Sequence, residues 1–402
     1  MNKTQLWEAE VQKQVTAWRR ALHQDPELSG QEKRTADKIM AALQQIGLEP
    51  HKADNCNGVT ALIRGALPGP TVALRADMDA LPIKEVLDLP YKSQNEGVMH
   101  ACGHDMHMAI ALGTALRLQH CRDLMKGNVR MIFQPAEELA PTGGARLVME
   151  AGFLDDVKAI FGLHVWPDLP CGKLAIKARG MMAASDRFKL TLIGRTSHAA
   201  HPHQGIDAIM AAADVLQNFS HIISRKINPV ATATISVGTI HGGDRYNVVA
   251  GRVVLEGTVR TLDHDSREKI PRFMEDVLEG LKRTYGLDYQ LDYHHGYPVL
   301  DNWEVPTELV QNTAIVLLGK DAVLTNPIPE LTAEDFSFYL SKYPGAFLWL
   351  GCHKKGEEMH GLHNAGFCPD EETLTIGSRL MCQVALDALD ALFKGVDFTK
   401  RE

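Results

Sequence analysis

Apolar residues in the first part of the chain recur with two different periods. In two stretches, 11–22 and 35–46, they recur at the spacing of a helix, and Gly47 ends the second stretch. Two short runs rich in β-branched residues follow at 58–64 and 71–76, joined by the turn sequence LPGP. The pattern therefore predicts two helices followed by two strands.

Strands and helices continue to alternate up to about residue 165. Strands are expected at 129–133 and 159–165, and helices at 144–151 and at the amphipathic run 108–118. Alternation of this kind is typical of an α/β sheet with helices packed on its faces. We therefore expect a central sheet flanked by helices.

The pattern changes after Gly180. The next elements are expected in the order strand, helix, strand, strand, helix and strand, at 187–193, 206–224, 231–240, 253–261, 266–285 and 287–293. This order is that of a ferredoxin-like α+β unit, although the segment could instead extend the first sheet. Alternation of helices and strands returns from about residue 302, at 306–318, 322–324, 333–340, 346–350 and 371–393. A smaller domain is therefore expected to interrupt a larger one.

Composition and charge exclude several classes of protein. The chain of 402 residues is 45% hydrophobic and 23% charged, which fits a globular protein large enough for two domains. Its net charge of −8, without a block of Lys or Arg, argues against a nucleic-acid partner. The polar start and the lack of any run of about eighteen apolar residues argue against a leader or membrane span, so we expect a cytoplasmic protein. The seven scattered cysteines are expected to be reduced thiols.

Polar clusters follow three of the expected strands. RADMD spans 75–79, QPAEE spans 134–138 and LHVWP spans 163–167. Open α/β sheets bind their ligands outside the carboxyl ends of the strands. The three clusters are therefore expected to meet at one site.

The sequence MHACGHDMH, at 99–107, concentrates side chains that bind metals. Cys102 and His104 stand two residues apart with Gly103 between them, so their side chains can converge on one point. A thiolate and an imidazole together suit a borderline-soft cation such as zinc. This stretch alone leaves two alternatives, namely buried structural residues or a thiol nucleophile with its base.

Polar groups at the expected strand ends form a larger set of candidates. They are Asp77, Asp79, Cys102, His104, Glu137, Glu138, His164 and His363. Glu137 and Glu138 are neighbours on an irregular backbone, so one can bind a metal while the other faces a substrate. Five of these residues are candidate metal ligands, which exceeds the three that a catalytic zinc needs: Cys102, His104, Glu138, His164 and His363. Two ions bridged by the Cys102 thiolate would use all five.

In combination, these motifs resemble those of a known family. The order RADMDALP, MHACGHDMH, QPAEE, LHVWP, SHAAHPH and LHNAGF is similar to that of the di-metal amidohydrolases of the aminoacylase and carboxypeptidase superfamily of metallopeptidases. The similarity is to the hippurate-hydrolase and auxin-conjugate-hydrolase subgroup and covers roughly 15–391. The resemblance implies five metal ligands and a general base, which are Cys102, His104, Glu138, His164 and His363 as ligands and Glu137 as the base.

The resemblance also implies the architecture and the assembly. A central mixed sheet flanked by helices, of the zinc-exopeptidase type, is expected from 1–182 and 298–402. The inserted ferredoxin-like α+β domain, 183–297, is expected to be a dimerisation module, giving a homodimer or a dimer of dimers. His198, in the motif GRTSHAAHPH, is then expected to reach the partner subunit's active site and help to polarise the scissile carbonyl.

Three further residues are expected to support binding. Asn247 matches an asparagine that contacts the substrate in the resembled subgroup, and Arg260 offers a cation for a substrate carboxylate. Asp77 is expected to orient a metal-bound imidazole such as His104. His201 stands where the subgroup usually has Met, a departure that bears on specificity.

The implied activity is metal-dependent hydrolysis of the amide of N-acyl amino acids, with acetyl, benzoyl or similar acyl groups. The products are a free amino acid and a carboxylic acid, and two divalent ions per chain are expected: zinc, manganese, cobalt or nickel. The alternatives are a metallo-dipeptidase or carboxypeptidase, a thiol hydrolase using Cys102, and a non-catalytic metal-binding scaffold. Glu137 argues against the scaffold, because a closed structural site needs no free base. Neither a nucleic acid nor a membrane is expected as a partner.

Overall fold

The computed structural model describes residues 3–358 and 360–400, which form two compact units. The first unit comprises the described parts of Met1–Arg179, Asp301–Ile328 and Asp335–Glu402. The second unit comprises Gly180–Leu300 and Pro329–Glu334. The segment expected as an inserted domain, 183–297, falls within the second unit, to which Pro329–Glu334 is added through backbone hydrogen bonds such as Glu330 N–H to Met181 O at 3.0 Å.

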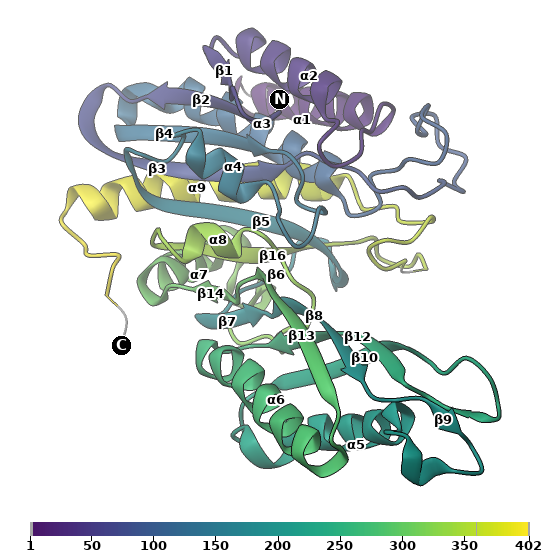
Figure 1. Cartoon of the computed structure of the whole chain (residues 1–402). Helices are drawn as coiled ribbons and strands as arrows, with labels where there is room; N and C mark the ends of the chain where they lie inside the picture. Colours follow the sequence, from purple (N-terminus) through teal and green to yellow (C-terminus); the bar gives the residue numbers. More distant parts are fainter. Residues whose placement is uncertain (1–2, 359, 401–402) are drawn as a thin grey trace. The chain divides into compact units, whose positions relative to one another are not determined.

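An eight-stranded mixed sheet forms the centre of the first unit (Figure 1). In spatial order its strands are β1 (Pro50–Lys52), β2 (Val59–Arg64), β4 (Lys126–Gln134), β3 (Leu67–Asp77), β5 (Val157–Pro170), β16 (Gly345–His353), β6 (Leu174–Ala175) and β15 (Val323–Leu324). β3 runs parallel to β4 and β5, and β16 runs parallel to β5, whereas β2 is antiparallel to β1 and β4. The expected mixed sheet flanked by helices is therefore confirmed.

Helices of the first unit pack on this sheet. They are α1 (Lys3–His23), α2 (Lys33–Gln45), α3 (His104–Cys121), α4 (Ala145–Glu150), α7 (Glu304–Leu318), α8 (Ser337–Leu340) and α9 (Glu372–Phe393), with short 3-10 turns η1 (Arg122–Leu124) and η4 (Lys320–Ala322). α3 and α9 pack against β3 and against each other, and α1 contacts both helices (Figure 1). The apolar faces of these helices and of the sheet make one continuous core.

Helix α3 differs from its expected character. The sequence predicts an amphipathic helix at 108–118, but α3 begins at His104 and almost all of its side chains are buried. The reason is that α3 packs against β3, α1 and α9. These contacts cover the faces of the helix, so the polar face of an amphipathic helix is not needed. At Gly113 a Cβ atom would lie 2.7 Å from Val15 Cγ2 and 3.0 Å from Ser378 Cβ, so glycine permits the close helix contacts.

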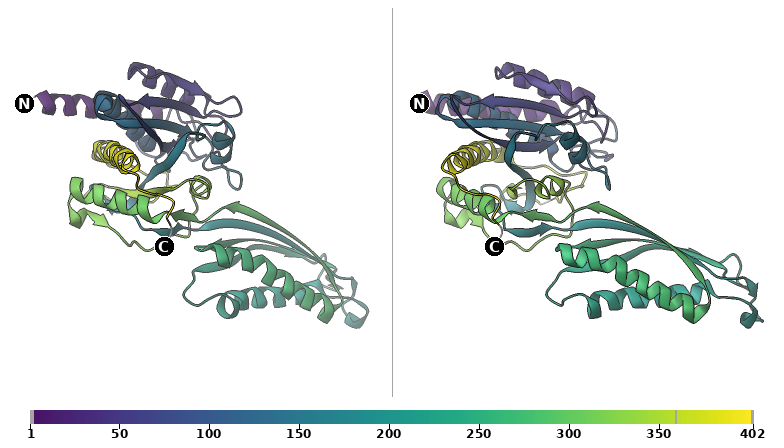
Figure 2. Two further views of the ribbon diagram at one scale, coloured as in Figure 1. Left: turned by 90° about the vertical axis from the view of Figure 1, so that its left-hand side faces the viewer. Right: turned by 60° about the vertical axis from the view of Figure 1, so that its left-hand side comes forward.

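The second unit has the expected order of strands and helices. Its main elements are β8 (Ala184–Ile193), α5 (Ala208–His221), β10 (Ala233–Gly242), β12 (Arg252–Thr261), α6 (His264–Tyr285) and β13 (Asp288–Tyr297). The strands form an antiparallel sheet in the order β10-β12-β8-β13, as in a ferredoxin-like unit, and α5 and α6 cover one face (Figure 2). Its small elements are β9 (Ser197–His198), β11 (Val248–Val249), η2 (Pro202–Gln204) and the π-turn η3 (Ile222–Lys226). The chain passes between the units through β7 (Arg179–Met182) and β14 (Leu300–Asn302).

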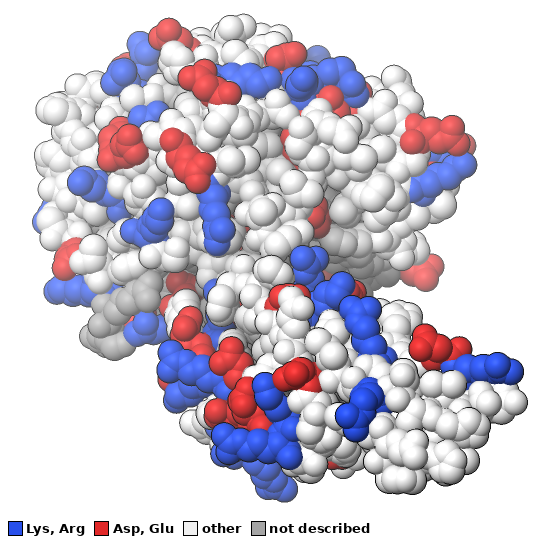
Figure 3. Space-filling view, viewed as in Figure 1, with Lys and Arg blue, Asp and Glu red and all other residues white. Residues whose placement is uncertain are grey.

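The charged surface is mixed. On the face seen in Figure 3, Lys and Arg side chains lie interspersed with Asp and Glu side chains on each unit. Within the described residues, no helix has the length and the apolar character that crossing a membrane requires. The surface seen in this view thus carries neither sign of charge as a continuous block.

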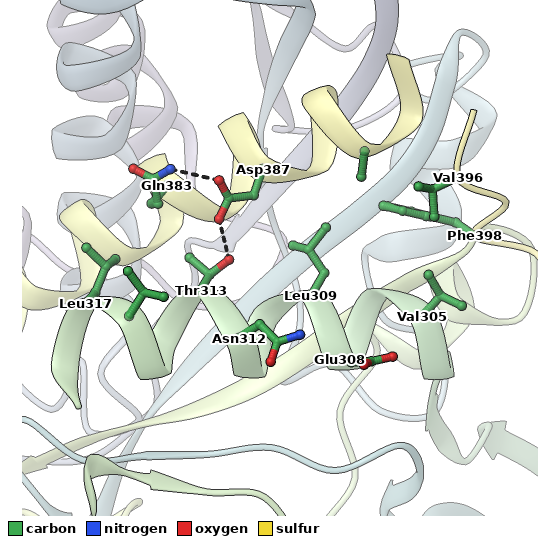
Figure 4. A pocket seen from close by; sticks show the side chains of 12 residues that line it. Val305, Glu308, Leu309, Asn312, Thr313, Leu317, Gln383, Asp387, Val396 and Phe398 are labelled. Atoms are coloured by element: carbon green, nitrogen blue, oxygen red, sulfur yellow. Dashed lines mark hydrogen bonds between the residues drawn. The ribbon is translucent and has the colours of Figure 1, made fainter. Parts of the chain in front are cut away.

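A surface groove of about 630 Å³ lies between α7 and α9 of the first unit (Figure 4). Its walls are largely apolar, with Leu309 and Leu317 on α7 and Phe398 beyond α9. Thr313 Oγ1 donates a hydrogen bond to Asp387 at 2.5 Å, which ties the two helices together across the groove. The residues lining this groove include none of the candidate site residues.

A buried arginine ties β3 to the segment that begins at Asp335. Arg75 donates from Nη1 to Asp77 Oδ2 and from Nη2 to Asp335 Oδ1, both at 2.7 Å. Gln134, the last residue of β4, accepts from Arg75 Nε at 2.9 Å and donates to Asp335 Oδ2 at 2.8 Å. All four side chains are buried, so the charges are paired where water cannot solvate them.

Replacing this arginine is expected to destabilise the first unit strongly. Arg75→Met keeps the apolar stem but leaves two buried carboxylates without their cation, which costs about 3–5 kcal/mol. All five tryptophans (7, 18, 166, 303 and 349) lie in the first unit, so the denaturation midpoint followed by tryptophan fluorescence reports this unit alone. Lys84→Met, which removes the exposed pair with Glu96, is the control and should leave the midpoint unchanged. Equal midpoints for Arg75→Met and the unsubstituted protein would contradict this account.

Candidate metal centre

The expected convergence of polar clusters begins at the ends of two parallel strands. Asp77 ends β3 and Gln134 ends β4, and the two residues are paired in register. The sequences that follow, Met78-Asp79 and Pro135 to Glu138, therefore leave the sheet at the same edge. His164 lies within β5, which runs parallel to β3.

Gly103 sets the geometry of the two residues beside it. Its φ of +87° is in the left-handed region, immediately before α3 begins at His104. A Cβ atom here would lie 2.5 Å from Val165 Cγ2, so both the conformation and the space require glycine. The turn brings Cys102 and His104 to the same point, as the sequence predicts.

One group of three possible ligands is fully buried. Cys102 Sγ, His104 and His164 have ligand atoms within 4.8 Å of one another, and His164 Nε2 lies 3.4 Å from Cys102 Sγ. His164 Nδ1 is 2.7 Å from Val165 O, and His104 Nδ1 is 2.9 Å from Asp79 O, so each Nδ1 carries the proton and donates it to a carbonyl. The Nε2 atoms are left as ligands, and His104 Nε2 has no hydrogen-bond partner among the described residues.

A second group of three shares the same thiol. Cys102, Glu138 and His363 also have ligand atoms within 4.8 Å of one another. Glu138 Oε1 lies 3.0 Å from His363 Nε2, without the geometry of a hydrogen bond. His363 is half exposed and has a φ of +60°, and its backbone N–H donates to Ala101 O at 2.9 Å. Cys102 is therefore placed to bridge two sites.

The electrostatics of the centre favour a cation. Burial, followed by the charges of Glu138 and Glu137, raises the pKa of the Cys102 thiol well above its usual value. Burial opposes the charged form of His104, but Asp77 and Asp79 prevail and raise its pKa to about 10. The shift of His104 expresses the negative charge of the surrounding carboxylates, which metal ions can neutralise in place of protons. The donor set of one thiol, three imidazoles and a carboxylate therefore fits divalent metals of the zinc type.

The expected role of Asp77 is corrected by the hydrogen bonds. His107 Nε2 accepts from Val165 N–H at 2.9 Å, so its Nδ1 carries the proton and donates to Asp77 Oδ1 at 2.6 Å. The hydrogen-bond partner of His104 is Asp79 instead, whereas Asp77 Oδ2 is 3.8 Å from His104 Nε2. Asp77 thus orients His107, which in turn holds the backbone next to His164.

Glu137 lies beside the two groups of ligands. Its carboxylate is within 4.8 Å of ligand atoms of His104 and Glu138. Its Oε1 accepts a hydrogen bond from Asp335 N–H at 3.3 Å, and the side chain is buried. Glu138 N–H in turn donates to Asp79 Oδ2 at 2.9 Å.

His198, which is expected to be catalytic, and Asn247 and Arg260, which are expected to bind substrate, all lie in the second unit. His198 in β9 is exposed and pairs with Val248 in β11, and Ala199 N–H donates to Asn247 O at 3.0 Å, so His198 and Asn247 are close together. The side-chain oxygen of Asn247 is buried without a hydrogen-bond partner among the described residues. Arg260 is half-buried near the far end of β12, about 26 Å along the strand from its start at Arg252, so the structure does not group it with the other two.

Sequence reasoning assigned no role to several residues that support the centre. Arg75 stands two residues before Asp77 at the end of β3, and this spacing was a signal that its side chain shares a face with that candidate. His107 stands in the metal motif itself, one helical turn after His104. The contact of Asp335 with Arg75 was not predicted, because the two residues are 260 positions apart in the sequence.

Known proteins with similar sequences and structures place this centre in a family. The chain matches the model of peptidase family M20/M25/M40 over residues 73–388. It is 40% identical over 381 residues to the N-acetyl-L-cysteine deacetylase of Bacillus subtilis (strain 168), covering 95% of this chain and 89% of the relative. It is 43% identical over 295 residues to the N-acyl-L-amino acid amidohydrolase of Geobacillus stearothermophilus, covering 73% of this chain and 80% of the relative.

A solved structure agrees with these relatives. The Bacillus subtilis YXEP protein, described as a dinuclear metal binding peptidase from the M20 family, has a TM-score of 0.84 to this chain at 36% identity. The match covers 95% of this chain and 99% of that one. The chain therefore belongs to peptidase family M20/M25/M40.

Proposed function

We propose that the protein is a metal-dependent amidohydrolase that cleaves N-acyl amino acids into a free amino acid and a carboxylic acid. One observation carries the proposal: the Cys102 thiol belongs to two groups of metal ligands, and the carboxylate of Glu137 lies beside them. A thiol nucleophile would have no use for Glu138, His164 and His363. The names of two relatives, a deacetylase of N-acetyl-L-cysteine and an N-acyl-L-amino acid amidohydrolase, support the substrate class.

Two divalent ions would be held by five side chains of this chain. Cys102 would bridge them, with His104 and His164 on one side and Glu138 and His363 on the other. Such ions supply acidification of a water molecule and polarisation of the scissile carbonyl. The thiolate and imidazole ligands favour zinc, and manganese, cobalt and nickel are the alternatives.

Glu137 is proposed as the general base. Its carboxylate takes a proton from the attacking water and returns that proton to the leaving amine. The hydrogen bond from Asp335 N–H at 3.3 Å fixes one carboxylate oxygen, so the side chain keeps one orientation during both transfers. Burial of Glu137 keeps bulk water from competing for the proton.

The second unit is proposed to complete the site of a partner chain. His198 Nδ1 accepts from Ala200 N–H at 3.0 Å, so its exposed Nε2 carries a proton and can donate to a developing oxyanion. Asn247 is proposed to bind the α-carboxylate of the substrate by neutral hydrogen bonds. Arg260 lies about 26 Å along β12 from that end of the unit, so its proposed charge-assisted hydrogen bond to the same carboxylate requires that the two residues come from different chains of a dimer. The binding energy of this carboxylate, which is remote from the scissile bond, can then lower the activation free energy of the hydrolysis step.

A homodimer through the second unit is proposed on the basis of its surface. β10 is an edge strand with mostly exposed residues, and an unpaired edge can pair with a second copy. Ile209 and Met210 on α5, and Ile240 on β10, are exposed apolar side chains. A dimer of such dimers remains compatible with this surface. The cytoplasm is proposed as the compartment because all seven cysteines are unpaired thiols.

The substrate class is tested with three compounds assayed side by side. N-acetyl-leucine is expected to be cleaved, N-acetyl-leucine amide is expected to react far more slowly because it lacks the carboxylate, and Gly-Leu is expected to be a poor substrate. Larger acyl groups should give graded rates, on the order of 10- to 200-fold per methylene at most. Cleavage of the dipeptide alone would indicate a metallo-dipeptidase. Equal cleavage of the acid and the amide would contradict recognition of the carboxylate.

Substitutions of the two adjacent glutamates are expected to have different effects on metal content and on kcat. Glu137→Gln should keep about two divalent ions per chain but lower kcat by roughly two to four orders of magnitude, the usual contribution of an acid/base group. Glu138→Gln should instead lose metal, because it removes a ligand. Elemental analysis of both purified variants, together with kcat, separates the two roles. The reverse pattern would show that the assignments within the pair are exchanged.

Catalysis across the dimer is expected to be recoverable by mixing two inactive variants. A heterodimer of Glu137→Gln and His198→Ala chains has one site with neither change. Random exchange should restore about a quarter of the unsubstituted activity, because half of the dimers are heterodimers with one intact site each. Native mass spectrometry verifies the exchange. No recovery in a fully exchanged mixture would rule out a contribution of His198 in trans.

A further inference from the structure

The residue before the proposed base has an unusual backbone conformation. Ala136 has a φ of +57°, in the left-handed region that residues with a Cβ rarely adopt. It lies in the turn between β4 and the pair Glu137 and Glu138, and it is buried. A conformation of this kind persists only where surrounding groups hold it.

One fully buried carboxylate holds this backbone. Glu32 Oε1 accepts hydrogen bonds from Ala136 N–H and from Gly30 N–H, both at 2.8 Å. Glu32 Oε2 accepts from Asn57 Nδ2 at 3.2 Å, so each of these three partners donates. Glu32 has no exposed surface.

Glu32 also stands at the start of a helix, but its side chain does not serve that helix. It is the residue before α2, and its carboxylate makes no capping hydrogen bond to the first turn. Only its backbone carbonyl does so, by accepting from Ala36 N–H at 2.9 Å. The carboxylate is therefore directed to the turn after β4 and not to its own element.

We propose that Glu32 is a positioning residue, which holds Ala136 in the left-handed conformation and so directs Glu137 and Glu138 into the metal centre. The proposal rests on the proposed function in so far as Glu137 is the base and Glu138 a ligand. Asp79 holds the other end of the same turn by accepting from Glu138 N–H at 2.9 Å. Without Glu32, the turn loses its anchor at Ala136, and Ala136 N–H is left buried without its acceptor.

Three substitutions of Glu32 distinguish its role as a hydrogen-bond acceptor from the effect of its negative charge. Glu32→Gln keeps an oxygen at the same reach and should retain most of kcat. Glu32→Asp keeps the charge but withdraws the acceptor by one methylene, and Glu32→Ala removes it. Both should lower kcat on the order of 100-fold with KM little changed, because a misplaced base affects the chemical step. Both should also weaken binding of zinc by about 10- to 100-fold in a titration of the metal-free protein, because Glu138 is displaced as well.

A matched control comes from a second buried carboxylate near the same helix. Glu27 Oε2 accepts from Thr35 N–H at 2.8 Å and makes no hydrogen bond to the turn after β4 among those found in the described residues. Glu27→Ala should destabilise this region but leave kcat and zinc affinity unchanged.

Rescue provides the second arm of the experiment. Glycine adopts the left-handed conformation without the penalty of a Cβ atom, so adding Ala136→Gly to Glu32→Asp should recover kcat by about fivefold or more. The same pair of variants remains informative should Glu32→Ala fail to fold.

The proposal is overturned if Glu32→Gln is as defective as Glu32→Asp, if Glu27→Ala lowers kcat to the same extent, or if Ala136→Gly gives no recovery. These failures differ from failure of the proposed function. If Glu137→Gln kept full activity, the assignment of the base would fail whatever the Glu32 variants did. In that case the zinc affinity still reports whether the turn that carries Glu138 has moved.

Discussion

The buried carboxylates at one edge of the central sheet are the constraint on which the rest of the structure depends. Asp77, Asp79, Glu137 and Asp335 are all buried there, and each must be paired with a cation or with hydrogen-bond donors. Arg75 neutralises the inner side by bonding to Asp77 and Asp335. On the outer side Asp77 and Asp79 raise the pKa of His104 to about 10, which marks the negative charge that metal ions would balance. This edge of the sheet is thus arranged around the buried guanidinium of Arg75 and a place for further positive charge.

The backbone adopts energetically unfavourable conformations where these groups come together. Gly103, Ala136 and His363 all have positive φ, and each stands beside or among the candidate metal ligands. Two of them have a Cβ atom, so their conformations are strained and are held by specific hydrogen bonds to Glu32 and Ala101. Strain is concentrated where side chains from β3, β4, α3 and the segment before α9 must meet.

Much of this arrangement is predictable from the sequence, because its signals are local. The α/β sheet with its flanking helices follows from the alternating periods, and the meeting of Cys102, His104, Glu138 and His164 follows from motifs at strand ends. Asp77 was expected to orient His104, but Asp77 ends β3 and Asp79 follows two residues later, and only the atomic positions decide which carboxylate reaches the ring. The burial of α3 on all sides depends on helices distant in sequence.

Other features depend on tertiary contacts that no local pattern encodes. Asp335 reaches Arg75 and Glu137 from a segment that follows the whole second unit, and Glu32 reaches Ala136 across more than a hundred residues. Their neighbours in the sequence are ordinary loop and helix residues. The account as a whole rests on Cys102 being shared by two metal ions. Anomalous diffraction from crystals of the zinc-loaded protein, measured at the zinc edge, tests this most directly. The account predicts two peaks, one on each side of Cys102 Sγ. A single peak, or two peaks of which only one contacts that sulfur, would contradict it.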